Sequence, residues 1–195
     1  MTTTFVAKCL TMFKSQIPLQ TPLAIKVVLS TIILTFFAGW SLSGDASGEE
    51  LNWRRQIVAS NKQDSELDSL VQKVHAAVNE YRASQNLPPL KLNAQISKQA
   101  QIHSQNMAQE EVKFSHVGFD DRVDTLGKSI AYTSAAENVA YNQGYQDPAS
   151  KAVAGWIKSP GHKKNMVGNY NLTGIGVAKN KQGEYYFTQI FILGK

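Results

Sequence analysis

Residues 173–192 read TGIGVAKNKQGEYYFTQIFI, and this stretch decides the fold class. Two segments within it, residues 173–179 and 184–192, are rich in β-branched and aromatic residues, which strands favour. The polar run Asn180-Lys181-Gln182-Gly183 between them is typical of a turn. The stretch therefore predicts an antiparallel β-hairpin.

Three segments upstream of the hairpin carry helix signals. Apolar residues recur at spacings of three and four over residues 65–86, which predicts an amphipathic helix ending before Leu87-Pro88-Pro89. Asn93 is a good N-cap for a second helix. Asp147 followed by Pro148 starts a third, which we expect to stop at Ser159-Pro160-Gly161.

A third strand is favoured over residues 130–141, which read IAYTSAAENVAY. Helices combined with an antiparallel sheet indicate an α+β layered domain, which we place at residues 65–195. Residues 47–64 are polar and rich in Ser, Gly, Asn and Gln, so we interpret them as a linker.

The first part of the sequence has the order of an export signal. Residues 27–42 carry no charge, and the charged residues before them are all lysines, namely Lys8, Lys14 and Lys26. As a helix this run reaches about 24 Å, short of a bilayer core of about 30 Å, which favours a cleaved signal peptide. A retained signal-anchor, tethering the protein through residues 27–42, stays open. In both cases residues 1–46 direct the remainder out of the cytoplasm, as a secreted or membrane-anchored domain.

The net charge and the single cysteine argue against disulfide bonds, a cysteine nucleophile and a nucleic-acid partner. The single cysteine, Cys9, precedes the apolar run, so the expected domain has no disulfide and no thiolate nucleophile. The chain carries +5, and residues 1–46 hold three lysines and one aspartate, which leaves +3 for the remainder. That charge is far from a nucleic-acid-binding footprint. We expect a monomer without a nucleic-acid partner.

Five short motifs stand out along the domain. They are NEYR at 79–82, FSH at 114–116, AENVA at 136–140, WIKSPGH at 156–162 and YFTQIF at 186–191. In this order they resemble the CAP superfamily of cysteine-rich secretory proteins, insect venom antigens and plant pathogenesis-related proteins, in its cysteine-free bacterial form. The resemblance runs from about Leu67 onward and implies a three-layer α-β-α sandwich. It also implies a polar cleft, lined in many members by two His and two Glu.

The family residues carry over only in part. His116 matches the first histidine and Glu137 the glutamate before Asn138. Ser159 stands where other members have the second glutamate, and Tyr186 where they have the second histidine, just before Phe-Thr-Gln189. The chain instead has His162, in the Ser-Pro-Gly-His typical of bacterial members. The resemblance thus implies a triad with further ligand-binding candidates beside it: His116, Glu137 and His162, then Asn138, Ser159 and Gln189.

Each of these residues also has a structural interpretation. His116 could be a histidine satisfied by backbone groups, and Glu137 could pair with a cation or a loop amide, because a buried carboxylate needs a partner. Arg82 fits a structural role, either in bracing a loop or in pairing with a carboxylate. His75 and His103 are assigned to the surface or core edge of their helices.

Three classes of function follow. The first is a non-catalytic exported binding domain whose cleft takes a ligand or a divalent metal through His116, Glu137 and His162. Two His and one Glu are the ligand set of an open zinc site. The ligand could be a small molecule, lipid, peptide or cell-wall component. The second class is a hydrolase, either metal-assisted or using Ser159 with His162 and Glu137. The third is a structural or adhesive envelope module.

Overall fold

The computed structural model describes residues 48–195. The expected signal or anchor, including the apolar run 27–42, lies outside these described residues. In the described part, no helix has the length and apolar character needed to cross a membrane.

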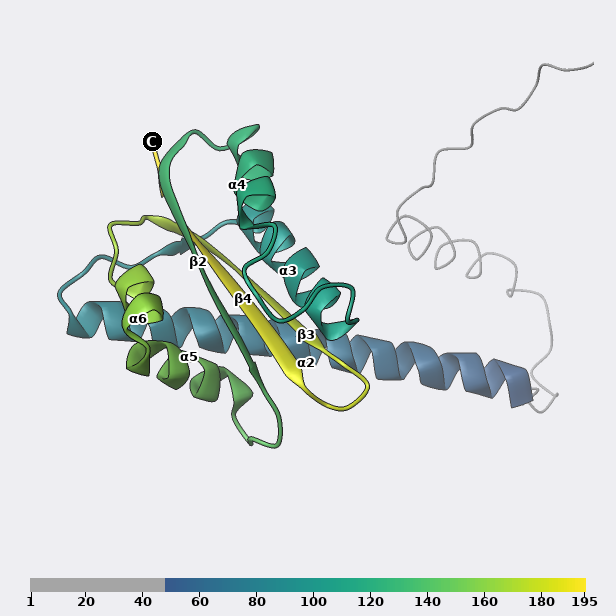
Figure 1. The fold of residues 1–195 in the computed structure, drawn as a ribbon. Coiled ribbons are helices and arrows are strands. Elements are labelled where there is room, and N and C mark those ends of the chain that lie inside the picture. Colours follow the sequence, from purple (N-terminus) through teal and green to yellow (C-terminus); the bar gives the residue numbers. More distant parts are fainter. Residues whose placement is uncertain (1–47) are drawn as a thin grey trace, which may run out of the picture. The chain divides into compact units, whose positions relative to one another are not determined.

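A four-stranded sheet forms the middle layer (Figure 1). Its strands are β1 (Lys91–Leu92), β2 (Tyr132–Asn142), β3 (Leu172–Lys179) and β4 (Tyr185–Gly194), in the order β1-β3-β4-β2. The predicted hairpin is confirmed, because β3 pairs antiparallel with β4. The predicted third strand, β2, pairs antiparallel with the other side of β4 and is an edge strand.

Helices cover both faces of the sheet. One layer contains α2 (Gly48–Ser84), α5 (Pro148–Lys158) and α6 (Pro160–Met166), and the other contains α3 (Ala94–Ala108) and α4 (Phe119–Gly127). The sequence-based fold class, an α+β three-layer α-β-α sandwich, is therefore confirmed.

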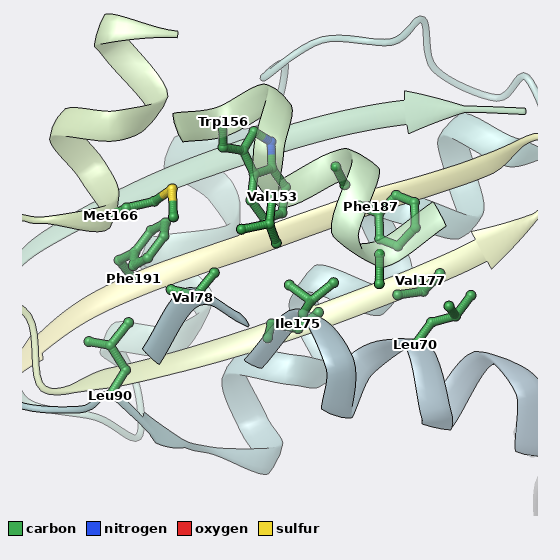
Figure 2. Close-up of a cluster of buried hydrophobic side chains, with 13 residues drawn as sticks. Leu70, Val78, Leu90, Val153, Trp156, Met166, Ile175, Val177, Phe187 and Phe191 are labelled. Atoms are coloured by element: carbon green, nitrogen blue, oxygen red, sulfur yellow. The ribbon is translucent and has the colours of Figure 1, made fainter. Parts of the chain in front are cut away.

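The larger hydrophobic core lies between the sheet and the layer of α2, α5 and α6. Figure 2 shows Met166 of α6 beside Phe191 of the sheet, and Trp156 beside Val153 in α5, all within the same core cluster. Trp156 is 1% exposed, and its indole Nε1 donates to the backbone oxygen of Val139 at 3.0 Å. This bond satisfies the polar atom of the buried ring and fastens α5 to β2.

Helix α2 begins at Gly48 rather than near Ser65, so residues 48–64 are helical and the expected linker is corrected. Glu49 and Glu50 in the first turn favour a helix start through the helix dipole, and no proline interrupts the run. The buried residues of α2 begin only at Leu70. The polar residues 48–64 therefore belong to the exposed half of a helix, and not to an irregular linker.

The predicted helix caps are present. The side chain of Asn93 accepts from the backbone N–H groups of Gln95 and Ile96 at 2.9 and 3.2 Å. Asp147 accepts from the N–H of Ser150 at 3.2 Å. The stop expected at Ser159-Pro160-Gly161 is followed at once by a new helix, because Pro160 takes the first helical position of α6, where proline is favoured.

Candidate functional site

The candidate site lies along edge strand β2. Glu137 of β2 is 5% exposed, and His116, in the segment between α3 and α4, has a side chain 50% exposed. His116 Nδ1 is 3.0 Å from Glu137 Oε1. An ionised carboxylate only accepts hydrogen bonds, so Nδ1 is the donor. In the neutral ring, Nε2 is then the nitrogen with a free lone pair.

Arg122 of α4 holds the carboxylate of Glu137. Its Nε donates to Oε2 and its Nη2 to Oε1, both at 2.9 Å, while Nη1 donates to the backbone oxygen of Val117 at 3.0 Å. Arg122 is itself only 9% exposed. A two-pronged pair of this kind offsets much of the cost of burying both charges. Arg122 thereby also ties the His116 segment to α4.

His162 approaches this pair from the other helical layer. Its ring centroid is 6.1 Å from that of His116, with a tilt of 52° between the planes. Desolvation lowers the pKa of His162, and nearby His116 adds to the effect. A neutral ring at physiological pH follows, with one donor and one acceptor nitrogen.

Two asparagines place His162. Asn138 Nδ2 donates to the backbone oxygen of His162 at 3.1 Å. Asn165 Nδ2 donates to Asn138 Oδ1 at 2.9 Å and to the backbone oxygen of Glu137 at 3.1 Å. These bonds fix the short helix α6 against β2, so His162 sits beside the strand edge. Asn138 is fully buried and positions the site from behind.

The other two candidates take no part in this cluster. Gln189 is 0% exposed, and its Nε2 donates to Thr173 Oγ1 at 3.1 Å. It lies in β4 between Phe187 and Phe191, on the face toward α2 and α5, because alternate residues of a strand share a face. The expectation that Gln189 lines the cleft is corrected. Ser159 precedes α6 and makes no side-chain cap bond to it.

The nucleophilic triad considered for Ser159 is not assembled. Such a triad requires the carboxylate to orient the histidine that activates the serine. Glu137 bonds to His116 and Arg122 instead of His162. The histidine that Glu137 orients is therefore His116, and not His162, which lies three residues after Ser159.

The three-ligand zinc set also does not fit. Both oxygens of Glu137 accept hydrogen bonds from Arg122. Within residues 48–195, no group of three His, Cys, Asp or Glu side chains is arranged to hold a metal ion. His116 and His162 alone supply two nitrogen ligands, fewer than the three protein ligands of an open zinc site.

His103, which we expected at the surface or core edge of its helix, is instead buried, whereas His75 is half-buried. His103 is 2% exposed, and its Nε2 lies 2.8 Å from the backbone oxygen of Ser115, directly before His116. Desolvation lowers the pKa of His103. His75 Nε2 lies 2.9 Å from the backbone oxygen of Leu90. His103 therefore braces the segment that presents His116.

Known proteins show the same family and fold. The family model for the cysteine-rich secretory protein family, CAP, matches residues 75–191. Bacillus subtilis YkwD is 33% identical over 136 residues, covering 66% of this chain and 49% of the relative. The B. subtilis membrane protein YlbC is 31% identical over 143 residues, covering 72% of this chain and 36% of the relative.

A solved structure agrees with this. An extracellular protein from Bacillus anthracis that contains an SCP domain is 27% identical, with a TM-score of 0.55, and the match covers 77% of this chain and 45% of that one. The chain spans less than half the length of each of these three proteins. It belongs to the cysteine-rich secretory protein (CAP) family, as its motifs predicted.

Proposed function

We propose that this protein is a non-catalytic, extracytoplasmic binding domain whose cleft at the edge of β2 holds a ligand through His116 and His162. The observation that carries the proposal is the hydrogen bond from His116 Nδ1 to Glu137 Oε1. It holds a half-exposed ring in one orientation, with its second nitrogen free for a ligand. Such preorganisation lowers the entropic cost of binding.

The chemistry of the two rings favours a ligand with hydroxyl groups. A neutral His116 offers an acceptor at Nε2, and a neutral His162 offers one donor and one acceptor. A hydroxyl both donates and accepts, so it can satisfy both rings at once. Among the partners predicted from the sequence, a cell-wall glycan has the greatest density of such groups.

The position of the carboxylate supports binding over catalysis. Metal-assisted hydrolysis requires a metal site with an open position, and a serine hydrolase requires a carboxylate behind its catalytic histidine. Glu137 is engaged by Arg122 and supports His116 rather than His162. An extracytoplasmic location is supported by the export-like residues 1–46 and by the similar extracellular protein of B. anthracis.

Side-chain NMR of the histidines tests this function. The purified protein is titrated separately with solubilised cell-wall glycan fragments, phospholipid vesicles and a mixed peptide pool. We expect the glycan fragments to shift the imidazole resonances of His116 and His162 saturably. His75, which bonds to Leu90, serves as the internal control and should not move. His116→Ala should abolish binding without unfolding the protein.

Other outcomes decide among the alternatives. Saturable binding that leaves both cleft histidines unshifted contradicts the proposed site. Turnover of an ester, peptide or glycan that is lost in His162→Ala favours the hydrolase. No saturable response to any of the three ligand classes favours a structural or adhesive module.

A further inference from the structure

We propose that Arg122 is a built-in cation of the cleft, which occupies Glu137 in place of a divalent metal and makes ligand binding there metal-independent. The inference concerns the same cleft and so rests on the proposed function, but it makes a separate statement about zinc. It gives Arg122, which none of the sequence motifs contains, the role of setting what the cleft accepts.

Three hydrogen bonds engage the carboxylate of Glu137, and the guanidinium of Arg122 donates to both of its oxygens. In the ion pair the closest approach is 2.7 Å, between Nη2 and Oε2, and the two side chains are 10% and 1% exposed. Oε1 accepts a second hydrogen bond from His116 Nδ1. A metal bound to either oxygen would therefore lie directly against the guanidinium or displace it.

Displacement is opposed by charge in two ways. A zinc ion on Glu137 would lie within a few ångströms of a guanidinium that stays protonated at every physiological pH. Two like charges at that separation in a partly buried site repel strongly. Moving Arg122 aside instead would leave its buried guanidinium without the Glu137 carboxylate, and an unpaired buried charge is strongly destabilising.

The segment geometry points the same way. Arg122 Nη1 also donates to the backbone oxygen of Val117, the residue after His116. The same guanidinium therefore holds the carboxylate and the turn that presents the histidine. An exogenous cation bound at Glu137 would remove both contacts together.

Zinc titration of four proteins tests the inference. Zinc chloride alone is added, in chelator-free buffer and without a histidine tag, and heat is recorded by isothermal titration calorimetry. The proteins are the wild type, Arg122→Met, Arg122→Lys and the double variant Arg122→Met with Glu137→Gln. Methionine keeps much of the side-chain length and loses the charge, whereas lysine keeps the charge as the matched control.

We expect Arg122→Met to bind one zinc ion at least about 10-fold more tightly than the wild type, a gain on the scale that neighbouring groups exert on metal sites. Arg122→Lys should resemble the wild type, and the double variant should lose the gain. Glycan-fragment shifts of His116 in the wild type should be unchanged by a chelator.

Three results would overturn the inference. One is wild-type zinc binding at one-to-one stoichiometry that Glu137→Gln weakens at least about 10-fold. Another is a folded Arg122→Met, by circular dichroism, with no gain in zinc affinity. The third is ligand binding that a chelator abolishes. If Arg122→Met does not fold, the wild type compared with Glu137→Gln still decides. Zinc data are obtained even if no glycan binds, so failure of the proposed function is separate from failure of this inference.

Discussion

The side-chain amide of Gln101 makes both hydrogen bonds that a neighbouring strand would make to Val177. Its Nε2 donates to the backbone oxygen at 3.0 Å, and its Oε1 accepts from the backbone N–H at 2.9 Å. Ser97 Oγ accepts from the N–H of Ile175 at 3.3 Å in the same way. Since β1 pairs only with residues 172 and 173 of β3, helix α3 covers the rest of that edge. An unpaired edge would invite strand pairing with other chains.

Replacing Gln101 by leucine should destabilise the protein. Two backbone groups of Val177 would lose their partners, at a cost of about 1–3 kcal/mol. Gln105→Leu, at an exposed position of the same helix, should change the free energy of unfolding by less than about 0.5 kcal/mol. Urea denaturation measures both, and equal effects at the two positions would contradict the edge-covering role of Gln101.

A methyl group on Gly176 should have a large effect. A Cβ there would lie 2.2 Å from the backbone nitrogen of Gln101 and 2.3 Å from the carbonyl carbon of Ala100. Helix α3 would have to move off the sheet, so we expect Gly176→Ala to cost about 3 kcal/mol or more. Gly155→Ala in α5 is the matched control, because no atom lies within 4 Å of its added Cβ.

That control should gain up to about 1 kcal/mol from better helix propensity. Thermal unfolding monitored by circular dichroism compares the two variants. A Gly176→Ala protein as stable as the wild type would show that α3 does not lie directly on the backbone of β3.

Arg82 should be required for stability, although it pairs with no carboxylate within residues 48–195. It is 1% exposed and donates to four backbone oxygens, those of Pro88, Met166, Gly168 and Tyr170. Of the two structural roles that the sequence left open for Arg82, these bonds support the loop brace. Arg82→Met leaves these carbonyls without that donor, and we expect a loss of about 3 kcal/mol or more. Arg82→Lys should recover part of the loss, and a cost below about 1 kcal/mol for methionine would contradict the brace.

Acid should weaken the fold through His103. Desolvation holds the pKa of His103 below its usual value, so the unfolded chain binds this proton more readily than the folded one. The contribution of neutral His103 to the free energy of unfolding is fully present above its pKa in the unfolded chain, about 6.5. It is lost as the pH falls from there toward the lower pKa of the folded protein. His103→Gln should flatten the dependence of unfolding free energy on pH between about 7.5 and 5. An unchanged slope would show that His103 does not titrate as its burial predicts.

Local chemistry explains what could be predicted from the sequence. The caps at Asn93 and Asp147 and the hairpin around residues 180–183 each depend on residues adjacent in the chain. The predicted start of α2 was wrong because the first half of this helix buries no side chains. The sequence of that half therefore shows no apolar periodicity. Helix α6 was missed because a Ser-Pro pair ends one helix and starts the next equally well.

The site could be predicted only in part. His116, Glu137 and His162 came from motif positions, and the structure brings these three together. Arg122 directly follows Asp120 and Asp121, in a segment for which the sequence predicted no helix or strand and which the structure shows as α4. Its burial is decided by Glu137, fifteen residues further on. Such a contact depends on the packing of α4 against β2 and leaves no local trace in the sequence.

Gln189 was misplaced for a different reason. Its position in the Phe-Thr-Gln motif of the family does not specify which face of the strand it occupies. Phe187 and Phe191 lie two residues to either side and are both fully buried, so strand alternation assigns Gln189 to the core face. The same alternation places Tyr186, three residues before Gln189, on the opposite face of the strand.

The central claim is that Glu137 fixes His116 with the proton on Nδ1 and leaves Nε2 as the acceptor nitrogen, and the tautomer of His116 tests it most directly. Long-range ¹H–¹⁵N correlation NMR distinguishes a proton on Nδ1 from one on Nε2. In the neutral ring of the wild type we expect the proton on Nδ1, held by Glu137 Oε1. In the double variant Glu137→Leu with Arg122→Met, which removes the acceptor of His116 and leaves no unpaired buried charge, the two tautomers should interconvert. A wild-type His116 protonated on Nε2, or a tautomer unchanged in this double variant, would contradict the account.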